Sequence, residues 1–544
     1  METVTAVLLL LGAVVVSGFV ARIRAGLFPL PLVQVGIGVA IDGFLGMGLS
    51  IDPELFFLLF LPPLLFLDGW RISKDDVVRY RSVILGLALG LVALTVFGVG
   101  YLLNWLAPAM PLGVAFALAA VISPTDPVAV AAISARAKIP ERLMHILEGE
   151  ALLNDASGLV CMRFAVAAVL TGGFSLGDAI GDFVWLASGG LGIGVVVTLV
   201  VTRVKWAAVL RLGEEAGSEI LISLLIPFGA YLVAERLGCS GILAAVAAGV
   251  TMSYVEQTGV VLALTRLRRS AVWDAIQFAA NGMVFVLLGE QLPKIMKGAS
   301  SIVGGDGFLG AIELSAIVLT VYAALVSLRI VWVYISMQLF FYSRAEDLRR
   351  HRHPNPRLVL VASLAGVRGA VTLAGVMTLP LATASGAPFP SRDLAILLAA
   401  GVIIVSLVAA SVGLPKLLKN LRLPPEPSQQ RTEDHARTVA ADAAIAAIAG
   451  ALERFSVTTG KAEAYAGASA TLMADYRGRI DRGSKTGDEA AMLKTFDKIE
   501  RELRLIGYRA ERDALYRLAR THEISHEVAR RLVSEVDFAE ARQS

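Results

Sequence analysis

The sequence predicts an all-α polytopic membrane protein with thirteen transmembrane helices and a helical cytosolic tail. Three observations lead to this prediction: the composition, the length of the apolar runs and the charge of the loops. Of the 544 residues, 56% are hydrophobic and only 17% are charged, and the mean hydropathy is +0.69. Soluble domains carry about 25% charged residues. The deficit indicates that much of this chain lies in lipid.

Long apolar runs fill residues 1–421, and a bilayer crossing needs about 20 of them in succession. On this criterion we expect spans at 3–22, 28–48, 53–69, 82–106, 112–133, 142–171, 181–202, 216–237, 239–255, 272–292, 308–340, 356–382 and 393–417. The remainder, 422–544, is rich in charged residues and begins with the proline-rich stretch Leu423–Pro427. Apolar residues recur in it at helical spacing, so we expect a cytosolic domain of two to four amphipathic helices.

Basic residues concentrate in alternate loops between the predicted spans. These loops contain Arg22, Arg24, Arg71, Lys74, Arg79, Arg81, Arg136, Lys138, Arg142, Arg203, Lys205, Arg211, Arg266, Arg268, Arg269, Arg344, Arg349, Arg350, Arg352 and Arg357. The intervening loops hold only Arg236, Lys294, Lys297 and Arg392. Because loops rich in Lys and Arg stay on the cytoplasmic side, we expect the N-terminus outside and the C-terminus in the cytosol.

The fifth span contains two prolines three residues apart, Pro124 and Pro127, which flank Thr125 and Asp126. Proline lacks an N–H and disfavours α geometry at the residue before it. We therefore expect the helix to unwind here. Irregular backbone at membrane depth is tolerated only inside protein or along a wet cavity. A simple proline kink is the alternative, and the carboxylate of Asp126 makes it the weaker one.

The twelfth span has a second interruption, in which Gly366 and Gly369 flank Arg368. An arginine cannot lose its charge in this setting, so it needs an anionic or carbonyl partner. The fifth and twelfth spans are seven apart, which would make them equivalent in two inverted six-helix repeats. Interrupted helices at matching positions of two halves indicate a transporter binding site.

The sixth span carries two carboxylates in an apolar run, Glu150 and Asp155. Glu150 shares a helix face with Asn154, four residues on. Asp155 lies about 140° round from Glu150, so the two acids have different partners. We expect Glu150 to form a structural ion pair with Arg329 or Arg368. Asp155 then remains to exchange ligands in a water-filled cavity.

A partly desolvated carboxylate holds a proton more readily than one in water, so a proton and a small cation can compete for it. The expected ion- and proton-binding group is Asp155, Asn154, Thr125, Asp126 and Ser157, with Asp68 at the end of the third span as an additional candidate or a helix cap. A monovalent cation, Na⁺, K⁺ or Li⁺, would bind at Asp155. If the loaded site faces one side at a time, the two ions must exchange. We expect no cofactor besides the transported Na⁺ or K⁺ and H⁺.

These motifs together resemble those of the bacterial branch of the monovalent cation:proton antiporter-1 family, the sodium/proton exchangers. The matching stretches are Leu61–Trp70, Ser123–Pro127, Gly149–Gly158, Asn281–Gly289 and Ala365–Ala374. The resemblance implies thirteen helices in two inverted six-helix repeats, a mobile core domain and a homodimer. It also implies residence in the bacterial cytoplasmic membrane and a role in pH and cation homeostasis.

The resemblance further implies roles for individual residues. Asn154 and Asp155 look like the family's Asn–Asp pair, in which the aspartate binds the ion and the proton. Electrogenic relatives have two adjacent aspartates there, so Asn154 implies electroneutral exchange. Glu150 with Arg329 is similar to the family's stabilising ion pair. A final set, Thr125, Asp126 and Arg368, marks the crossing of the broken helices.

Other function classes fit less well. An ATP-driven pump is disfavoured because the sequence has no Gly-x-x-x-x-Gly-Lys-Ser/Thr phosphate loop. The Gly238–Gly241 stretch matches the motif of intramembrane serine proteases, but no histidine lies deep in a later span to activate Ser240. We therefore expect no enzyme. A cation- or proton-coupled symporter of a small organic anion stays open, because Arg368 could bind a carboxylate.

Overall fold

The computed structural model describes residues 2–23, 29–45, 53–72, 74–134, 139–171, 176–213, 215–256, 263–300, 308–344, 355–383, 386–419, 427–458, 462–484, 488–521, 523 and 526–541. These residues form helices and connecting turns, and the only β structure among them is an isolated bridge between Ala382 and Pro388. The chain divides into two compact units, Met1–Arg422 and Leu423–Ser544. Most of the proline-rich stretch between them, and several basic loop residues, lie outside the described ranges.

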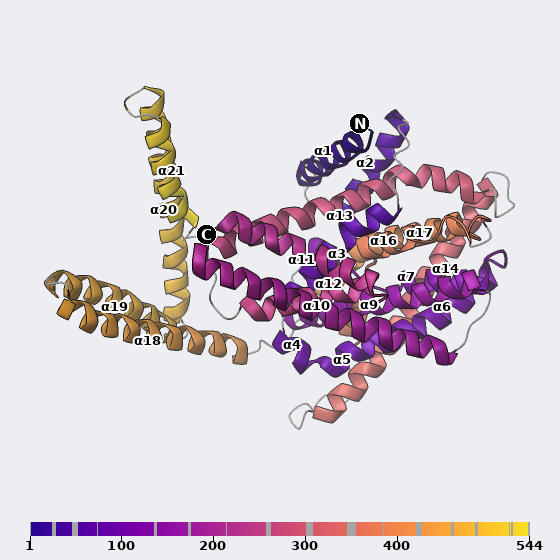
Figure 1. Cartoon of the computed structure of the whole chain (residues 1–544), viewed down its shortest axis with the longest axis horizontal. Coiled ribbons are helices and arrows are strands. Elements are labelled where there is room, and N and C mark those ends of the chain that lie inside the picture. The colour runs from indigo at the N-terminus through magenta and orange to yellow at the C-terminus, as the bar shows by residue number, and fades with distance from the viewer. Residues whose placement is uncertain are drawn as a thin grey trace. The chain divides into compact units, whose positions relative to one another are not determined.

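The first unit is a bundle of apolar helices (Figure 1). Its elements are α1 Glu2–Ile23, α2 Leu30–Leu45, α3 Pro53–Arg71, α4 Lys74–Arg79, α5 Arg81–Leu85, the π-helix η1 Gly86–Leu91, α6 Val92–Leu106, α7 Leu112–Val121, α8 Pro127–Ser134, α9 Glu141–Thr171, α10 Leu176–Leu212, α11 Ala216–Arg236, α12 Gly241–Glu256, α13 Ala263–Ser300, α14 Phe308–Arg344, α15 Pro356–Leu364, α16 Ala370–Met377 and α17 Arg392–Leu418. Within the described residues, eight helices are long and apolar enough to cross a membrane.

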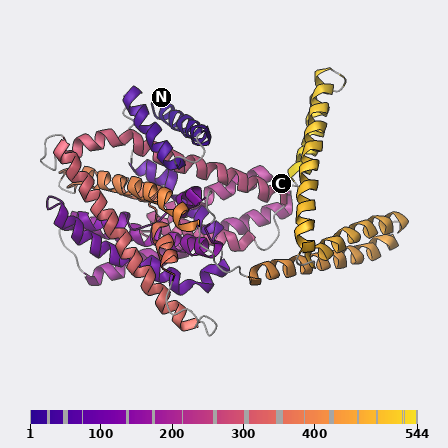
Figure 2. The same cartoon turned by 180° about the vertical axis from the view of Figure 1, so that it is seen from behind.

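Glycines let several of these helices pack with their backbones in contact. A Cβ at Gly38 of α2 would lie 2.0 Å from the carbonyl oxygen of Val286 in α13. A Cβ at Gly249 of α12 would likewise lie 2.0 Å from the carbonyl oxygen of Phe66 in α3. Accordingly α13 packs closely on α2, and α12 on α3, α10 and α11, whereas α9 packs on α7 and η1. Seen from behind, α14 crosses the unit as one continuous helix (Figure 2).

Two helices are interrupted at the predicted places. The first breaks between α7 and α8, over Ile122–Asp126, and the second between α15 and α16, over Ala365–Gly369. Proline accounts for the first break, because Pro127 begins the new helix at the position where its missing N–H costs nothing. Gly369 is the extended residue before α16, with φ −137° and ψ −151°.

The second unit consists of four described helices: α18 Pro427–Thr458, α19 Ala462–Ser484, α20 Asp488–Arg520 and α21 His526–Ala541. The helices pack as two pairs, α18 with α19 and α20 with α21 (Figure 1). In the second pair Arg512 forms ion pairs with Asp537 and Glu540.

Candidate functional site

The two interrupted helices meet, and Arg368 bridges their carboxyl ends. Its Nε donates to the carbonyl oxygen of Ile122, which follows α7, at 2.9 Å, and its Nη1 donates to that of Gly366, which follows α15. Both helix ends carry partial negative charge from unsatisfied carbonyls. The buried guanidinium, 3% exposed, therefore neutralises two helix ends at once.

Asp126 stabilises the amino end of α8, where backbone N–H groups carry partial positive charge. Its Oδ1 accepts hydrogen bonds from the backbone N–H groups of Val128 at 2.8 Å and Ala129 at 3.1 Å, which caps α8. Its own N–H donates to the carbonyl oxygen of Val367 at 2.7 Å, which joins the two unwound segments. A Cβ at Gly369 would lie only 1.7 Å from Asp126 Oδ2, so glycine is required where α16 begins.

Beside this crossing is a cavity with three carboxylates in its wall. Its lining residues are Leu64, Asp68, Thr125, Asp126, Pro127, Val128, Asp155, Gln277, Asn281, Gly369, Ala370, Val371 and Thr372. The empty space, including its open mouth, is about 370 Å³. Asp68 thus lies in the cavity wall instead of only ending its helix. The sequence did not identify Gln277, Asn281 or Thr372 as members of the ion-binding group.

Asp155 is supplied to this cavity by α9 and is 4% exposed. Its neighbour Asn154 turns toward the first helix break, where Nδ2 donates to Thr125 Oγ1 at 3.1 Å. A longer contact of 3.4 Å joins the same nitrogen to Glu150 Oε1. The Oδ1 of Asn154 is buried and makes no hydrogen bond among the described residues. The amide therefore ties α9 to the break and keeps one oxygen unused.

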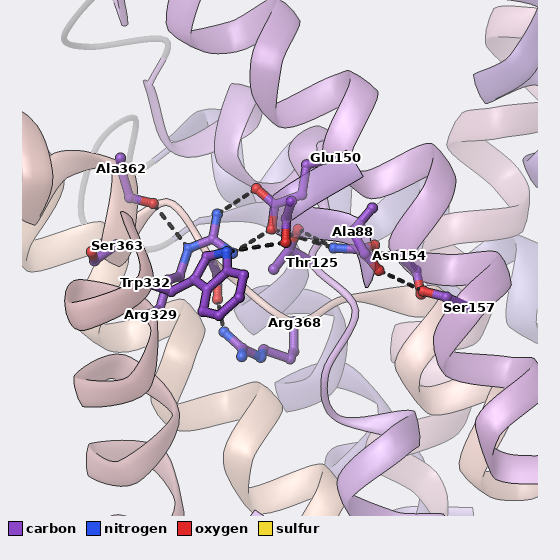
Figure 3. A network of polar contacts seen from close by, with 12 residues as sticks. Ala88, Thr125, Glu150, Asn154, Ser157, Arg329, Trp332, Ala362, Ser363 and Arg368 are labelled. Carbon is purple, nitrogen blue, oxygen red and sulfur yellow. Dashed lines mark hydrogen bonds and ion pairs between the residues drawn. The ribbon is translucent and has the colours of Figure 1, made fainter. Parts of the chain in front are cut away.

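Glu150 pairs with Arg329 of α14, the first of its two candidate partners (Figure 3). The contact is bidentate: Nη1 donates to Oε1, and Nη2 donates to Oε2 at 2.7 Å. Arg329 also donates from Nε to the carbonyl oxygen of Ala362 in α15 at 3.1 Å. A Cβ at Gly366 would lie 2.8 Å from Arg329 Cδ, so this glycine makes room for the arginine. The pair joins α9, α14 and α15.

Ser157, predicted to bind the ion, is not among the residues that line the cavity. Its hydroxyl donates to the carbonyl oxygen of Ala88 in η1 at 2.8 Å, on the far side of Asn154 from Thr125 (Figure 3). The π-helical turn leaves that carbonyl accessible. The same element receives a hydrogen bond from Trp332 Nε1 to the Gly86 carbonyl oxygen at 3.0 Å. Two glycines, Gly86 and Gly90, are the features of the sequence that could have indicated an irregular helix at η1.

Arg163 of α9 binds Glu235 at the end of α11. Its Nη2 donates to Glu235 Oε1 at 2.9 Å, and that oxygen also accepts from the N–H of Gly241 at 3.1 Å. One carboxylate oxygen thus links α9 to the amino end of α12.

Comparison with known proteins identifies the class of protein to which this site belongs. The family model described as "Sodium/hydrogen exchanger, transmembrane" matches residues 6–420, a range that contains every residue of the site. The chain belongs to the sodium/hydrogen exchanger family. It is a multi-pass membrane protein of the monovalent cation:proton antiporter-1 group, and the relatives it resembles are transporters rather than enzymes.

Two bacterial relatives and one solved structure illustrate the similarity. The chain is 39% identical to the uncharacterized Na⁺/H⁺ exchanger YjcE of Escherichia coli, over 99% of both chains. It is 38% identical to the sodium, potassium, lithium and rubidium/H⁺ antiporter of Bacillus pumilus, over 97% of this chain and 76% of the relative. The fold matches that of the sodium proton antiporter MjNhaP1 of Methanocaldococcus jannaschii, with a TM-score of 0.60 and 19% identity, over 77% of this chain and 99% of that one.

Proposed function

We propose that this exchanger moves Na⁺, K⁺ or Li⁺ against H⁺ across the bacterial cytoplasmic membrane by alternating access at Asp155. The observation that supports it most is the position of Asp155 in a cavity beside the crossing of two broken helices. In this proposal ionised Asp155 binds the cation, and Asp68, the Thr125 region and a few waters supply further oxygen ligands. Protonation of Asp155 removes the charge that holds the cation and releases it.

The neighbours of Asp155 support giving it the exchange role. Glu150 is already neutralised by Arg329, and one oxygen of Asp126 is used to cap α8. Because a buried carboxylate is costly once it loses its partner, Glu150 and Asp126 are suited to holding the helices together. They are less suited to exchanging a cation for a proton. Ser157 donates its hydroxyl to η1 and is not a lining residue of the cavity, so the proposed ligands of the cation are Asp155 and the oxygens that line the cavity. Only the transported ions are expected to occupy the site.

We propose that exchange is electroneutral, with one proton for one cation. Asn154 carries no charge, and its amide bonds Thr125, so it adds no second titrating group beside Asp155. One carboxylate that carries either a proton or a monovalent cation crosses the membrane with the same net charge in both states. A small organic anion as co-substrate is disfavoured, because the Arg368 guanidinium is engaged with two backbone carbonyls.

The proposed topology has thirteen crossings. They are α1, α2, α3, α5 to α6, α7 with α8, α9, α10, α11, α12, α13, α14, α15 with α16, and α17. In this arrangement the two broken helices take the fifth and twelfth positions, which supports two inverted six-helix repeats joined by α10. The basic loops support an outer N-terminus, a cytosolic C-terminus and a cytosolic tail. We further propose that the protein works as a homodimer.

The test uses inside-out membrane vesicles acidified by respiration, in which a pH dye reports alkalinisation after Na⁺, K⁺ or Li⁺ is added. We expect cation-dependent alkalinisation that is lost in Asp155→Ala and retained in the control Asp393→Ala, since Asp393 is an exposed acid of α17. An Asp155→Ala variant with the wild-type response would contradict the proposed site.

A second measurement tests the stoichiometry. In liposomes that hold the purified protein, exchange is followed while a gradient of the permeant anion thiocyanate sets the membrane potential, with Na⁺ as the exchanged cation and no K⁺ present. Electroneutral exchange is expected to keep the same rate at either sign of the potential. A rate that follows the potential would exclude one-for-one exchange.

A further inference from the structure

One face of α13 carries a row of polar side chains that leads into the Asp155 cavity. Asp274, Gln277 and Asn281 are spaced by three and four residues, which places them on the same side of a helix. Gln277 and Asn281 line the cavity. Asp274 is one turn further out, and its side chain is 61% exposed. The row therefore runs from an exposed side chain to the cavity wall, and this end of the cavity is called its mouth below.

Arg71, at the end of α3, holds the outer part of this row. Its Nη1 donates to Gln277 Oε1 at 2.8 Å, and its Nη2 pairs with Asp274 Oδ1. Asp68, another lining residue, is one turn earlier on the same helix. Because a guanidinium only donates, the Gln277 atom that faces it is the carbonyl oxygen. In this arrangement Arg71 occupies the one oxygen that Gln277 has for a cation.

We propose that Gln277 is a specificity-determining residue at the cavity mouth, and that Arg71 is a positioning residue that controls its amide oxygen. This rests on the proposed function, since the ligand concerned is the cation that Asp155 binds. A cation that passes the mouth loses water and needs replacement oxygens, whose number and position discriminate among ions of different size. Gln277 supplies such an oxygen when it leaves Arg71.

The geometry of Arg71 explains why an arginine suits this position. The two terminal nitrogens of its guanidinium bind Asp274 and Gln277 separately. Asp274 can therefore hold the guanidinium in place while the amide of Gln277 moves between Arg71 and the cation. A lysine keeps the charge but is a point donor without the fork. Arg71→Lys keeps the positive charge that repels cations but removes the second nitrogen that holds Gln277. The variant therefore distinguishes the effect of positioning Gln277 from the effect of the charge.

The experiment measures KM and the maximal exchange rate for Li⁺, Na⁺ and K⁺ in inside-out vesicles. Gln277→Ala is expected to raise KM about twofold to tenfold, the range for loss of one polar contact. The factor should differ among the three cations, while the maximal rate stays within about twofold. The matched control Gln338→Ala, a glutamine of α14 that donates to Tyr334 within its own helix, should change neither.

Arg71→Lys is expected to act in the opposite direction and to lower KM. In the Gln277→Ala background it should have no further effect, because no amide oxygen remains to be released; coupled residues are non-additive in this way. Arg81→Gln, at an exposed arginine that begins α5, serves as the charge control and should leave KM unchanged.

Two results would overturn the inference while leaving the proposed function standing. One is a Gln277→Ala effect that is equal for all three cations, as a general structural disturbance would produce. The other is an Arg71→Lys effect that persists in the Gln277→Ala background. Exchange that survives Asp155→Ala would instead overturn the proposed function, and this inference with it.

Discussion

Glu150 and Arg329 are each at most 2% exposed, and the charge of each is compensated by the other. A buried ion pair contributes little compared with an apolar pair of the same volume, but loss of one partner leaves an uncompensated charge. The role of this pair is therefore to fix how α9, α14 and α15 fit together. That arrangement holds the segment of α9 that contains Asp155 against the break between α7 and α8.

Glu150→Gln is expected to destabilise the protein by about 3–5 kcal/mol, since Arg329 then lies buried without a counter-charge. The apparent Tm of the detergent-purified protein measures this. The double variant Glu150→Leu with Arg329→Met should be more stable than Glu150→Gln, because no charge remains buried. Glu313→Gln, at an exposed residue of the same helix as Arg329, is the control and should match the wild type. Equal Tm values for Glu150→Gln and its control would contradict the buried pair.

Gly369 allows a second test at the residue scale. Gly369→Ala places a methyl group 1.7 Å from Asp126 Oδ2, which forces the carboxylate or the start of α16 to move. Such overpacking costs typically about 1–3 kcal/mol, and here it falls on the cavity wall. We expect exchange to be largely lost while the protein still inserts in the membrane. Gly192→Ala, which meets nothing within 4 Å, should exchange normally. Normal exchange by Gly369→Ala would show that the close approach is not needed.

The Arg163 contact matters at the scale of the helices, because it joins elements that otherwise pack in different groups. The C-terminal end of α12 contacts α3 next to Arg71, since Trp70 donates to Glu256 at 2.7 Å. Gly241, whose N–H donates to Glu235 of α11, begins α12, about 22 Å from that end at 1.5 Å per residue. The ion pair with Arg163 thus lies at the end of α12 that is away from Arg71. In the alternating-access cycle proposed above, we expect this pair to break when the cavity opens to the other side.

Arg163→Gln is expected to destabilise the conformation whose cavity is open on the side of Arg71. A half-exposed ion pair contributes about 0.2–1 kcal/mol, so KM for cations supplied at that end should rise about 1.5-fold to fivefold. Initial rates in vesicles of both orientations measure this. The exchanged pair Arg163→Glu with Glu235→Arg should recover part of the change. A charge exchange that behaves no better than either single variant would exclude the ion pair as the cause.

Local chemistry made the helix breaks predictable, whereas the rotation of each helix did not follow from the sequence. Pro124, Pro127 and Gly369 act within their own segments, so the interruptions could be located from spacing alone. The position of Ser157 outside the cavity lining could not be derived from the sequence, because the neighbour of its helix face, η1, is set by tertiary packing. Gln277 was missed for a related reason: an amide in a long helix gives no signal until α3 and α13 bring Arg71 to it.

At the scale of the whole molecule, the two units differ in what they share with relatives. The family model ends at residue 420, close to the end of the first unit at Arg422. The similarity to YjcE nevertheless continues over 99% of both chains, so that relative shares the tail as well. The first unit contains the cavity, both broken helices and the ion pair at Glu150. Exchange itself should therefore need only this unit.

A chain that ends at Arg422 is expected to insert in the membrane and to exchange cations for protons with a KM within about twofold of the full chain. The physical reason is that its apolar core is formed within residues 1–422, and a domain with its own hydrophobic core can fold alone. Vesicle exchange with both chains, at equal amounts of inserted protein, checks this. Arg512→Gln, which breaks the ion pairs between α20 and α21, gives a comparison in which only the tail is weakened. If the truncated chain inserts but does not exchange cations, the tail itself takes part in transport. A similar loss of exchange in Arg512→Gln would then show that the tail needs the intact α20–α21 pair for this role.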